Sequence, residues 1–387
     1  MLNNTLYAQA LSGTVVSNAT DVPIANATVF ISSTSYGTNT NEQGQYTINN
    51  IAAGNYELVV RCIGYETITY KLNANDLPLT IKFKMIVKVT VQDAVIVLPF
   101  DDDGWQKYGK QFMEAYIGTT ANSLQCSIVN KDVIKFRYNK KTNILEAVAT
   151  DIVIIKNEAL GYTIKHQLEE FSIDYNTKTV QQLGYMYFQP KTNIRKGKQN
   201  KYTQHRYAAY QGSIMHLIRC LYKGTYAAEG FVIRDFQLIP NKAKAEAKRA
   251  MQAQLKDTAY GLTISSNNNV LRQPDYFEVL TPTPLLHKQL IVHYDADTVN
   301  VYLRIPNLLH IEYTNEKQES RYYSTQFLRH KTAFQTTRIQ YATEPMDILL
   351  TQNGNYAPAL AILLNGYMGW EKLGEALPLD YEPILQL

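Results

Sequence analysis

The strongest constraint on the fold is an alternation of apolar and polar residues in the first part of this 387-residue chain. Successive side chains of a strand point to opposite faces, so an apolar residue at every second position predicts a strand with one buried face. Gly44 and Gly54 can adopt positive φ and supply turns between such segments. The pattern predicts a sandwich of short antiparallel strands. It is clearest in Thr28–Ile31, at Tyr46 and Ile48, and at Tyr56, Leu58 and Val60.

The same residues resemble a known family over about residues 10–98. The matching run is Gly13-x-Val15, Pro23-Ile24-x-Asn26-Ala27-x-Val29, Gly37-Thr38-Asn39-Thr40-Asn41-x-x-Gly44-x-Tyr46-x-Ile48, Ile51-x-x-Gly54-x-Tyr56-x-Leu58-x-Val60 and Ile63-Gly64-Tyr65. It is similar to the carboxypeptidase-regulatory-like, or transthyretin-like, domain, in which an aspartate stands where this chain has Asn41. The resemblance implies a seven-stranded Greek-key sandwich that accompanies other domains and is not itself catalytic.

The module also resembles the N-terminal extension of TonB-dependent outer-membrane receptors, in which Gln92–Val97 would be the closing strand. That resemblance implies a location in the bacterial cell envelope. Within residues 1–9, Leu6-Tyr7-Ala8-Gln9 is typical of the end of a secretory signal peptide, with Ala8 at the cleavage position. A disordered terminus is the alternative. We expect an exported protein that is periplasmic or associated with the outer membrane.

Residues 99–387 are expected to form a larger β-rich α+β region, so that the whole chain is mainly β. Helices are predicted near 104–117, 202–223 and 241–257, from apolar residues at helical spacing or from a run rich in Ala and Lys. Gly224 is expected to end the helix near 202–223, because glycine is common just after the last residue of a helix. Strands are predicted at 124–129, 133–138, 144–149, 152–155, 162–175, 231–239, 289–294, 299–305, 310–314, 338–341 and 347–351, with a hairpin turn at 353–355 and a short helix at 369–376.

This second region resembles a wider set of uncharacterised envelope proteins that carry the regulatory-like module. The matching residues include Tyr116-Ile117-Gly118, Glu229-Gly230-Phe231 and Gly369-Trp370-Glu371-Lys372-Leu373. That resemblance implies no known chemistry.

Composition narrows the class of protein. Apolar residues make up 45% of the chain, enough for packed cores, and the net charge of +4 is too diffuse for a nucleic-acid binder. The sequence has no run of about 18 apolar residues, so no transmembrane helix is predicted. The 29 tyrosines favour half-buried sheet faces, with a tyrosine-rich binding surface as the alternative. Three cysteines, Cys62, Cys126 and Cys220, lack metal-ligand spacing and are expected to be buried.

A zinc site is the first catalytic hypothesis to test, because the sandwich resembles a carboxypeptidase module. His166 and Glu169 fit the pattern His-x-x-Glu, but both lie in a predicted strand, where positions three apart face opposite sides. His216 lies near the apolar stripe of a predicted helix, with Arg219 one turn later, and is expected to be a hydrogen-bonded histidine where the helix meets a sheet. We therefore expect no catalytic residue, no metal and no cofactor.

Charged clusters offer few further sites. Asp101-Asp102-Asp103 is expected to cap a helix rather than bind a metal, and Asp295-Ala296-Asp297 to form a hairpin turn rather than a calcium loop. The most basic stretch is expected to be a solvated loop that at most contacts anionic lipid or glycan. Its cations are Arg195, Lys196, Lys198 and Lys201.

The leading functional hypothesis is therefore a non-enzymatic cell-envelope protein that binds or scaffolds an envelope protein or glycan, with possible peripheral association with the outer membrane. The alternative hypothesis is a peptidase-like hydrolase whose site is assembled from distant residues of the C-terminal region. His216, His166 and Glu169 are its candidate residues.

Overall fold

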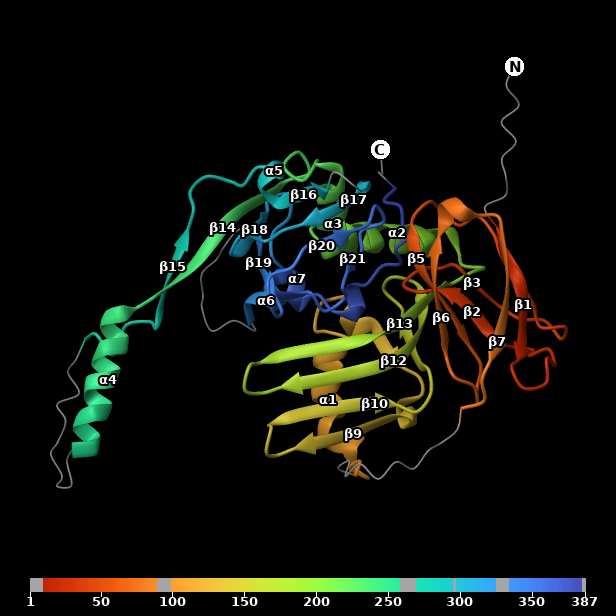
Figure 1. The fold of residues 1–387 in the computed structure, drawn as a ribbon, viewed down its shortest axis with the longest axis horizontal. Coiled ribbons are helices and arrows are strands. Elements are labelled where there is room, and N and C mark those ends of the chain that lie inside the picture. The colour runs from red at the N-terminus through yellow and green to blue at the C-terminus, as the bar shows by residue number, and fades with distance from the viewer. Residues whose placement is uncertain (1–9, 89–98, 258–268, 295–296, 325–333, 385–387) are drawn as a thin grey trace, which may run out of the picture.

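The computed structural model describes residues 10–88, 99–257, 269–294, 297–324 and 334–384. Strands hold 40% of the chain and helices 22%, which confirms the mainly β class. Figure 1 shows an N-terminal sandwich, a central sheet crossed by a helix, a C-terminal unit of two further sheets, and an arm that projects from that unit.

The sandwich is built from two sheets, as the alternation predicts. One sheet has the order β4-β1-β7 and the other β3-β2-β5-β6. Strand β1 pairs with β4 antiparallel and with β7 parallel. Apolar side chains from both sheets, including Leu11, Val29 and Leu58, form one buried core. The strands are β1 (Leu11–Ser17), β2 (Thr28–Ile31), β3 (Gly37–Asn39), β4 (Gln45–Ile48), β5 (Asn55–Arg61), β6 (Ile68–Asn73) and β7 (Leu79–Met85).

The central sheet packs one face against helix α1 (Gly104–Tyr116). Phe112 and Tyr116 from the helix and Phe136 and Phe171 from the sheet lie at the centre of this core. Strand β12 is the longest and pairs with β13 along one edge, and with β11 and β10 in turn along the other. The strands are β8 (Cys126–Ile128), β9 (Ile134–Asn139), β10 (Ile144–Ala149), β11 (Val153–Asn157), β12 (Tyr162–Asp174) and β13 (Thr179–Pro190).

Strand β13 is absent from the sequence prediction. Its side chains are polar or half-exposed over the first half, so no clean alternation marks it, and Gly184 interrupts the pattern. Gly184 is required by packing, because a Cβ there would lie 2.2 Å from the Gln167 carbonyl oxygen and 2.6 Å from His166 Nε2. This segment therefore forms a strand because it pairs with its long neighbour β12, and its own residue pattern does not predict one.

The helix predicted over 202–223 is wrong in its extent: it is two helices. Helix α2 (Lys196–Tyr210) begins six residues earlier, and α3 (Ile214–Lys223) begins after a break. At the break Gly212 has φ +71°, where a Cβ would lie 2.2 Å from Gln335 Oε1. Ser213 then caps α3 by accepting a hydrogen bond from the His216 backbone N–H, and Gly224 ends α3 in the left-handed conformation.

The C-terminal unit holds two sheets around α3. One has the order β15-β14-β18-β19-β22 and the other β16-β17-β20-β21. Their apolar side chains enclose a second large core with Leu217 and Leu221 of α3. The strands are β14 (Phe231–Pro240), β15 (Tyr276–Leu280), β16 (Ile291–Tyr294), β17 (Asp297–Leu303), β18 (Leu308–Tyr313), β19 (Gln335–Tyr341), β20 (Ile348–Leu350), β21 (Tyr356–Ala357) and β22 (Ile362–Gly366).

Helix α4 (Lys242–Asp257) belongs to the projecting arm, and three short helices complete the described part of the unit: α5 (His287–Leu290), α6 (Ser320–Ser324) and α7 (Tyr367–Trp370). The predicted short helix at 369–376 is wrong, because α7 ends at Trp370 and only a 3₁₀ turn, Leu373–Glu375, follows. The hairpin turn at 353–355 is present between β20 and β21, with Gly354 at φ +93°.

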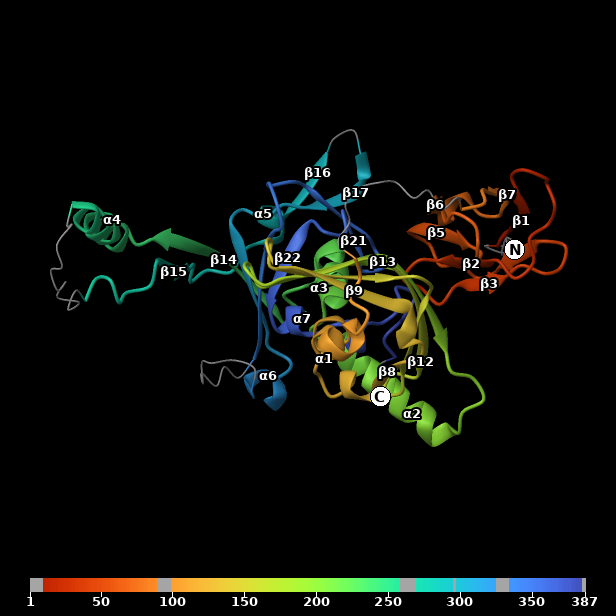
Figure 2. The same ribbon diagram turned by 90° about the horizontal axis from the view of Figure 1, so that it is seen from below.

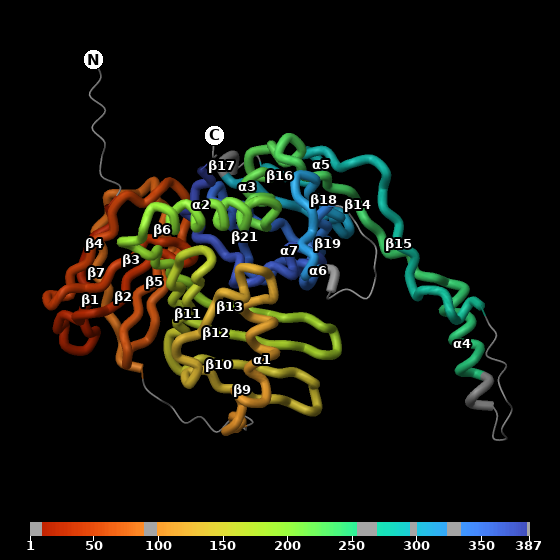
Figure 3. Tube along the Cα trace, turned by 180° about the vertical axis from the view of Figure 1, so that it is seen from behind, coloured from red at the N-terminus to blue at the C-terminus, as the bar shows by residue number. Residues whose placement is uncertain are grey.

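The sandwich is fastened to the central sheet by backbone pairing. The Ser33 N–H donates to the Met186 carbonyl at 2.6 Å, and the Phe188 N–H donates to the Thr34 carbonyl at 2.9 Å. Phe30 stacks on Tyr187 with ring centroids 5.5 Å apart. Figures 1 and 3 show the sandwich against this end of the sheet. Backbone hydrogen bonds and a ring stack thus connect the sandwich directly to β13.

Some sequence predictions fall outside the described residues. The signal-like Leu6–Gln9, the possible closing strand Gln92–Val97 and most of the Asp295–Asp297 turn belong to this group. No described helix is both long and apolar enough to cross a membrane.

Candidate functional site

His166 is a core residue. It is 1% exposed, and its ring stacks on Tyr116, whose hydroxyl oxygen lies 2.5 Å from His166 Nδ1. Burial lowers the pKa of His166 to about 3, so the imidazole stays neutral at ordinary pH. A neutral, enclosed ring of this kind orders the interface between α1 and β12.

Glu169 points away from His166. It lies at the irregularity where the β12–β13 register shifts between Leu168 and Glu170, and its side chain is exposed and accepts a hydrogen bond from Gln167 Nε2 at 2.5 Å. The two residues of the His-x-x-Glu pattern are therefore not brought together. No group of three or more His, Cys, Asp or Glu side chains that could hold a metal occurs in the described part of the chain.

His216 is also enclosed, at the start of α3. The Gly212 backbone N–H donates to its Nδ1 at 3.3 Å, and its ring packs against Tyr210, Phe231 and Tyr313. Burial first, and then the positive charge of Arg219, lowers its pKa to about 4. His216 therefore stabilises the sharp connection between α2 and α3.

Arg219 joins three segments. Its guanidinium donates to the backbone carbonyls of Asn353 and Leu379, each at 3.0 Å, and lies over the Tyr210 ring. These contacts tie α3 to the β20–β21 turn and to the C-terminal tail. Buried guanidinium groups need such acceptors, so this role is structural.

The basic stretch is the first turns of α2 rather than a loop. Arg195 stands at the N-cap position, and Lys196, Lys198 and Lys201 follow on exposed positions. Cations at a helix N-terminus oppose the helix dipole, which is why no N-terminal helix signal was visible here. Of these four cations, Lys198 alone lies near an acid of the described residues, 3.9 Å from Glu158.

Two other sequence predictions need correction. Asp103 stands at the N-cap position of α1 but makes no capping hydrogen bond, and instead pairs with Lys107 at 2.7 Å. Only Cys220 of the three cysteines is buried, since Cys62 and Cys126 are half-buried; all three are free thiols.

A large crevice separates the tip of the β12–β13 hairpin from β22 and α7. It has a volume of about 760 Å³, and Tyr322, Trp370 and Glu371 contribute to its walls together with Gln182 and Leu364. Tyr322, Tyr367 and Trp370 pack edge to face beside it, with ring centroids 5.2–5.4 Å apart.

The carboxyl of Glu371 is the most perturbed group of this crevice. Burial, followed by the neighbouring carboxylates of Glu375, Glu316 and Glu319, holds its pKa well above the usual range. Burial likewise raises the pKa of Glu316 to about 7 and raises that of Glu375. A protonated Glu371 can donate a hydrogen bond into the crevice.

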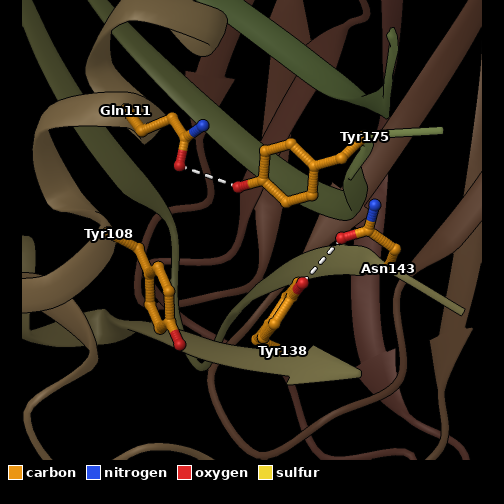
Figure 4. Close-up of a pocket in the computed structure, with 5 residues that line it drawn as sticks. All are labelled: Tyr108, Gln111, Tyr138, Asn143 and Tyr175. Carbon is orange, nitrogen blue, oxygen red and sulfur yellow. Dashed lines mark hydrogen bonds between the residues drawn. The ribbon is translucent and has the colours of Figure 1, made fainter. Parts of the chain in front are cut away.

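An open pocket of about 340 Å³ lies between α1 and the turn ends of the central sheet. Its lining residues are Tyr108, Gln111, Tyr138, Asn143 and Tyr175. Figure 4 shows the Tyr175 hydroxyl donating to Gln111 Oε1 at 2.7 Å and the Tyr138 hydroxyl donating to Asn143 Oδ1 at 2.6 Å. We call this site the tyrosine pocket.

The tyrosine pocket is uncharged but rich in hydrogen-bonding groups. Its three rings lie close together, with 6.4 Å between the centroids of Tyr108 and Tyr138 and 6.0 Å between those of Tyr138 and Tyr175. Burial is the main cause that raises the pKa of both Tyr108 and Tyr175, so their hydroxyls remain protonated. Ring faces and amides in one hollow suit a ligand that has both apolar faces and hydroxyl groups.

Neither the crevice nor the tyrosine pocket is predicted by the sequence. Tyr108 was visible only as part of a helical apolar stripe, and Tyr138 and Tyr175 only as strand ends. The single signal available was the high tyrosine content, 29 residues against 12 Phe and 2 Trp. Which tyrosines meet depends on strand register, and that is set by tertiary pairing.

A family of known domains matches the region of the N-terminal sandwich. Residues 11–97 match the CarboxypepD_reg-like domain, so this part of the chain is a module of that kind. No curated protein matches the chain.

The solved structures that are similar to the chain include two that cover different shares of it. One is a putative membrane-associated protein of unknown function from Bacteroides fragilis, with 9% identity, a TM-score of 0.17, and coverage of 92% of this chain and 97% of that one. The other is a 9R-lipoxygenase from Cyanothece, with 10% identity and a TM-score of 0.16; 58% of this chain is covered, and the match spans 49% of the lipoxygenase.

Proposed function

We propose that this protein is a non-enzymatic binding protein of the bacterial cell envelope, and that the tyrosine pocket binds a neutral glycan. The observation that carries the proposal is the lining of that pocket: three tyrosine rings and two amide side chains. Sugar rings offer apolar C–H faces that pack on aromatic rings, and hydroxyls that pair with amides.

The lining chemistry favours binding over catalysis. Tyr, Gln and Asn supply no acid or base that titrates near neutral pH, whereas hydrolysis needs such groups at the reacting bond. The CarboxypepD_reg-like module and the signal-like Leu6–Gln9 support export to the periplasm or the outer membrane. The backbone hydrogen bonds between the sandwich and β13 support a scaffolding role beside the binding one.

The test is glycan binding by the full chain, by the pocket variants Gln111→Ala and Tyr175→Phe, and by the control Gln106→Ala. Soluble neutral oligosaccharides of glucose, galactose, mannose and N-acetylglucosamine are titrated by calorimetry. Gln111→Ala removes an exposed amide from the pocket, and Gln106→Ala removes the same group from an exposed position of the same helix. Losing one hydrogen bond is worth about 0.5–1.5 kcal/mol, or roughly 2- to 13-fold in affinity.

Weakened binding in Gln111→Ala and Tyr175→Phe, with unchanged binding in Gln106→Ala, is the expected result. Failure of every oligosaccharide to bind, or equal loss in Gln106→Ala, would contradict the proposed ligand and site.

One observation favours a second candidate function, a hydrolase acting in the crevice. A carboxyl beside an aromatic ring, with a raised pKa, is the usual form of a general acid. Glu371 beside Trp370 fits this description. Glycosidase and peptidase activity that Glu371→Gln abolishes without unfolding the protein would establish this alternative against the binding proposal.

A further inference from the structure

The arm is the part of the molecule that the proposed function leaves unused. The second half of β14, all of β15 and helix α4 extend away from the body (Figures 1 and 2). Only two strands make this part of the sheet, because β18 pairs with β14 no further than Phe236. An isolated two-stranded ribbon has little stability of its own in water.

The ribbon exposes large apolar side chains in one place. Six of them are 40–52% exposed: Leu238, Ile239, Tyr276, Phe277, Val279 and Leu280. A contiguous exposed apolar patch marks an interaction surface for protein or membrane.

Both faces of the ribbon carry these groups. Register pairs Ile239 with Phe277 on one face, and the neighbouring positions Leu238 and Tyr276 point to the other face. The ribbon's one carboxylate, Glu278, is held by Arg338 of the body at 2.8 Å. A second protein surface would cover one face, whereas lipid surrounds both.

Helix α4 adds positive charge at the outer end of the arm. Lys242, Lys248 and Arg249 are exposed. Asp275 pairs with Lys244 at 3.2 Å and with Lys248 at 2.7 Å, which leaves Lys242 and Arg249 without an ion-pair partner among the described residues. Cations next to exposed apolar groups are the pattern of segments that lie in the interface of an anionic bilayer.

We propose that the arm is a membrane-contact element that binds an anionic phospholipid bilayer. The apolar side chains of the ribbon enter the boundary between headgroups and acyl chains, and the α4 cations lie among the lipid phosphates. The outer edges of β14 and β15 carry unpaired backbone groups, which restricts insertion to the hydrated interface, about 5–10 Å deep. This inference rests on the envelope location proposed above.

The test is co-sedimentation of the full chain with vesicles of phosphatidylethanolamine and phosphatidylglycerol, compared with phosphatidylcholine alone. The expected result is binding to the anionic vesicles that weakens as salt is raised, since salt screens the cations. Phe277→Glu is expected to weaken binding at least tenfold, and Arg249→Glu several-fold. Ile63→Glu is the matched control, because Ile63 is 81% exposed on the sandwich, away from the arm.

Three results would overturn the proposal: no vesicle binding by the wild-type chain, unchanged binding in Phe277→Glu, or an equal loss in Ile63→Glu. A lipid-free dimer that Phe277→Glu converts to monomer, without vesicle binding, would assign the ribbon to a second copy of the chain. Circular dichroism shows whether each variant remains folded. Glycan titration of the same samples separates the two proposals, because a failed arm leaves binding at the tyrosine pocket intact.

Discussion

Replacing Glu316 by glutamine is expected to stabilise the protein above neutral pH and to change it little in acid. Glu316 accepts a hydrogen bond from Gln335 Nε2 at 3.0 Å, beside other carboxylates. Burial is the main cause that raises its pKa from 4.5 to about 7. Gln335 Oε1 is buried without a partner, so the new amide brings a donor close to an unused acceptor.

The sign follows from proton linkage. The folded protein holds the Glu316 proton more tightly than the unfolded chain does, because the folded pKa is the higher one. The stabilisation from this proton is fully present only below about pH 4.5 and is lost as the pH rises through about 7. Glutamine cannot ionise and avoids that loss.

The magnitude follows from the same pKa. Each pKa unit corresponds to about 1.4 kcal/mol, so the rise from 4.5 to about 7 gives at most about 3.4 kcal/mol above pH 7. Partial exposure of the carboxylate screens it, which reduces the expected gain to about 2 kcal/mol. For a unit of this size that is a rise in Tm of about 4–8 °C at pH 8.

The assay is thermal unfolding of wild type and Glu316→Gln at pH 4.5, 6 and 8. The difference in Tm between the two proteins at each pH reports on residue 316, because all other titrating groups are the same in both. Glu114→Gln is the control, since Glu114 is exposed on α1 and the substitution changes the net charge equally. A Glu316→Gln protein that is no more stable than wild type at pH 8, or that keeps the same dependence on pH, would refute the reasoning.

Three further outcomes are expected. Phe30→Ala, which removes the ring stacked on Tyr187, should cost about 3 kcal/mol and make the sandwich–sheet seam more accessible to hydrogen exchange. Gly212→Ala should lower the Tm measurably, because its φ of +71° and the nearby Gln335 side chain leave no room for a Cβ. NMR should show that His166 and His216 stay neutral from pH 8 to pH 5. Because burial lowers both pKa values, the two histidines stabilise the fold above about pH 6.5 and lose that contribution in acid. Titration of either ring near pH 6.5 would show instead that the ring is open to solvent.

Local patterns predicted those elements whose own residues carry the signal. Strand β10 alternates throughout and β12 alternates on either side of its irregularity at Glu169, and both lie where the pattern predicts them. Helix α2 begins six residues before its predicted start, because its first turns are basic and carry no helix-start signal. Further along the helix, Arg206 Nε donates to the Leu160 carbonyl at 2.7 Å and holds α2 against the central sheet. Strand β15 was missed because its side chains are apolar on both faces, which gives no period-two pattern.

The sequence predicts less of the candidate sites than of the fold. Tyr108 lies on α1, while Tyr138 and Tyr175 end strands far apart in sequence, and nothing local links them. Glu371 becomes unusual because the fold buries it, and because Glu316, from a distant segment, lies near it together with the neighbouring Glu375. Strand geometry did exclude the His166–Glu169 pair, since opposite faces follow from the sequence alone.

The sequence by itself determined the mainly β class, the N-terminal module over residues 11–97 and the periodicity of most strands, because these can be read from the order of apolar, polar and turn residues along the chain. Tertiary structure alone decided which strands became neighbours, where helix α2 ends against α3, and which side chains meet in the tyrosine pocket and the crevice. It also left the β14–β15 ribbon apolar on both faces and uncovered. The physical reason is that register, burial and shifted pKa values arise from packing between distant segments, which no local pattern encodes.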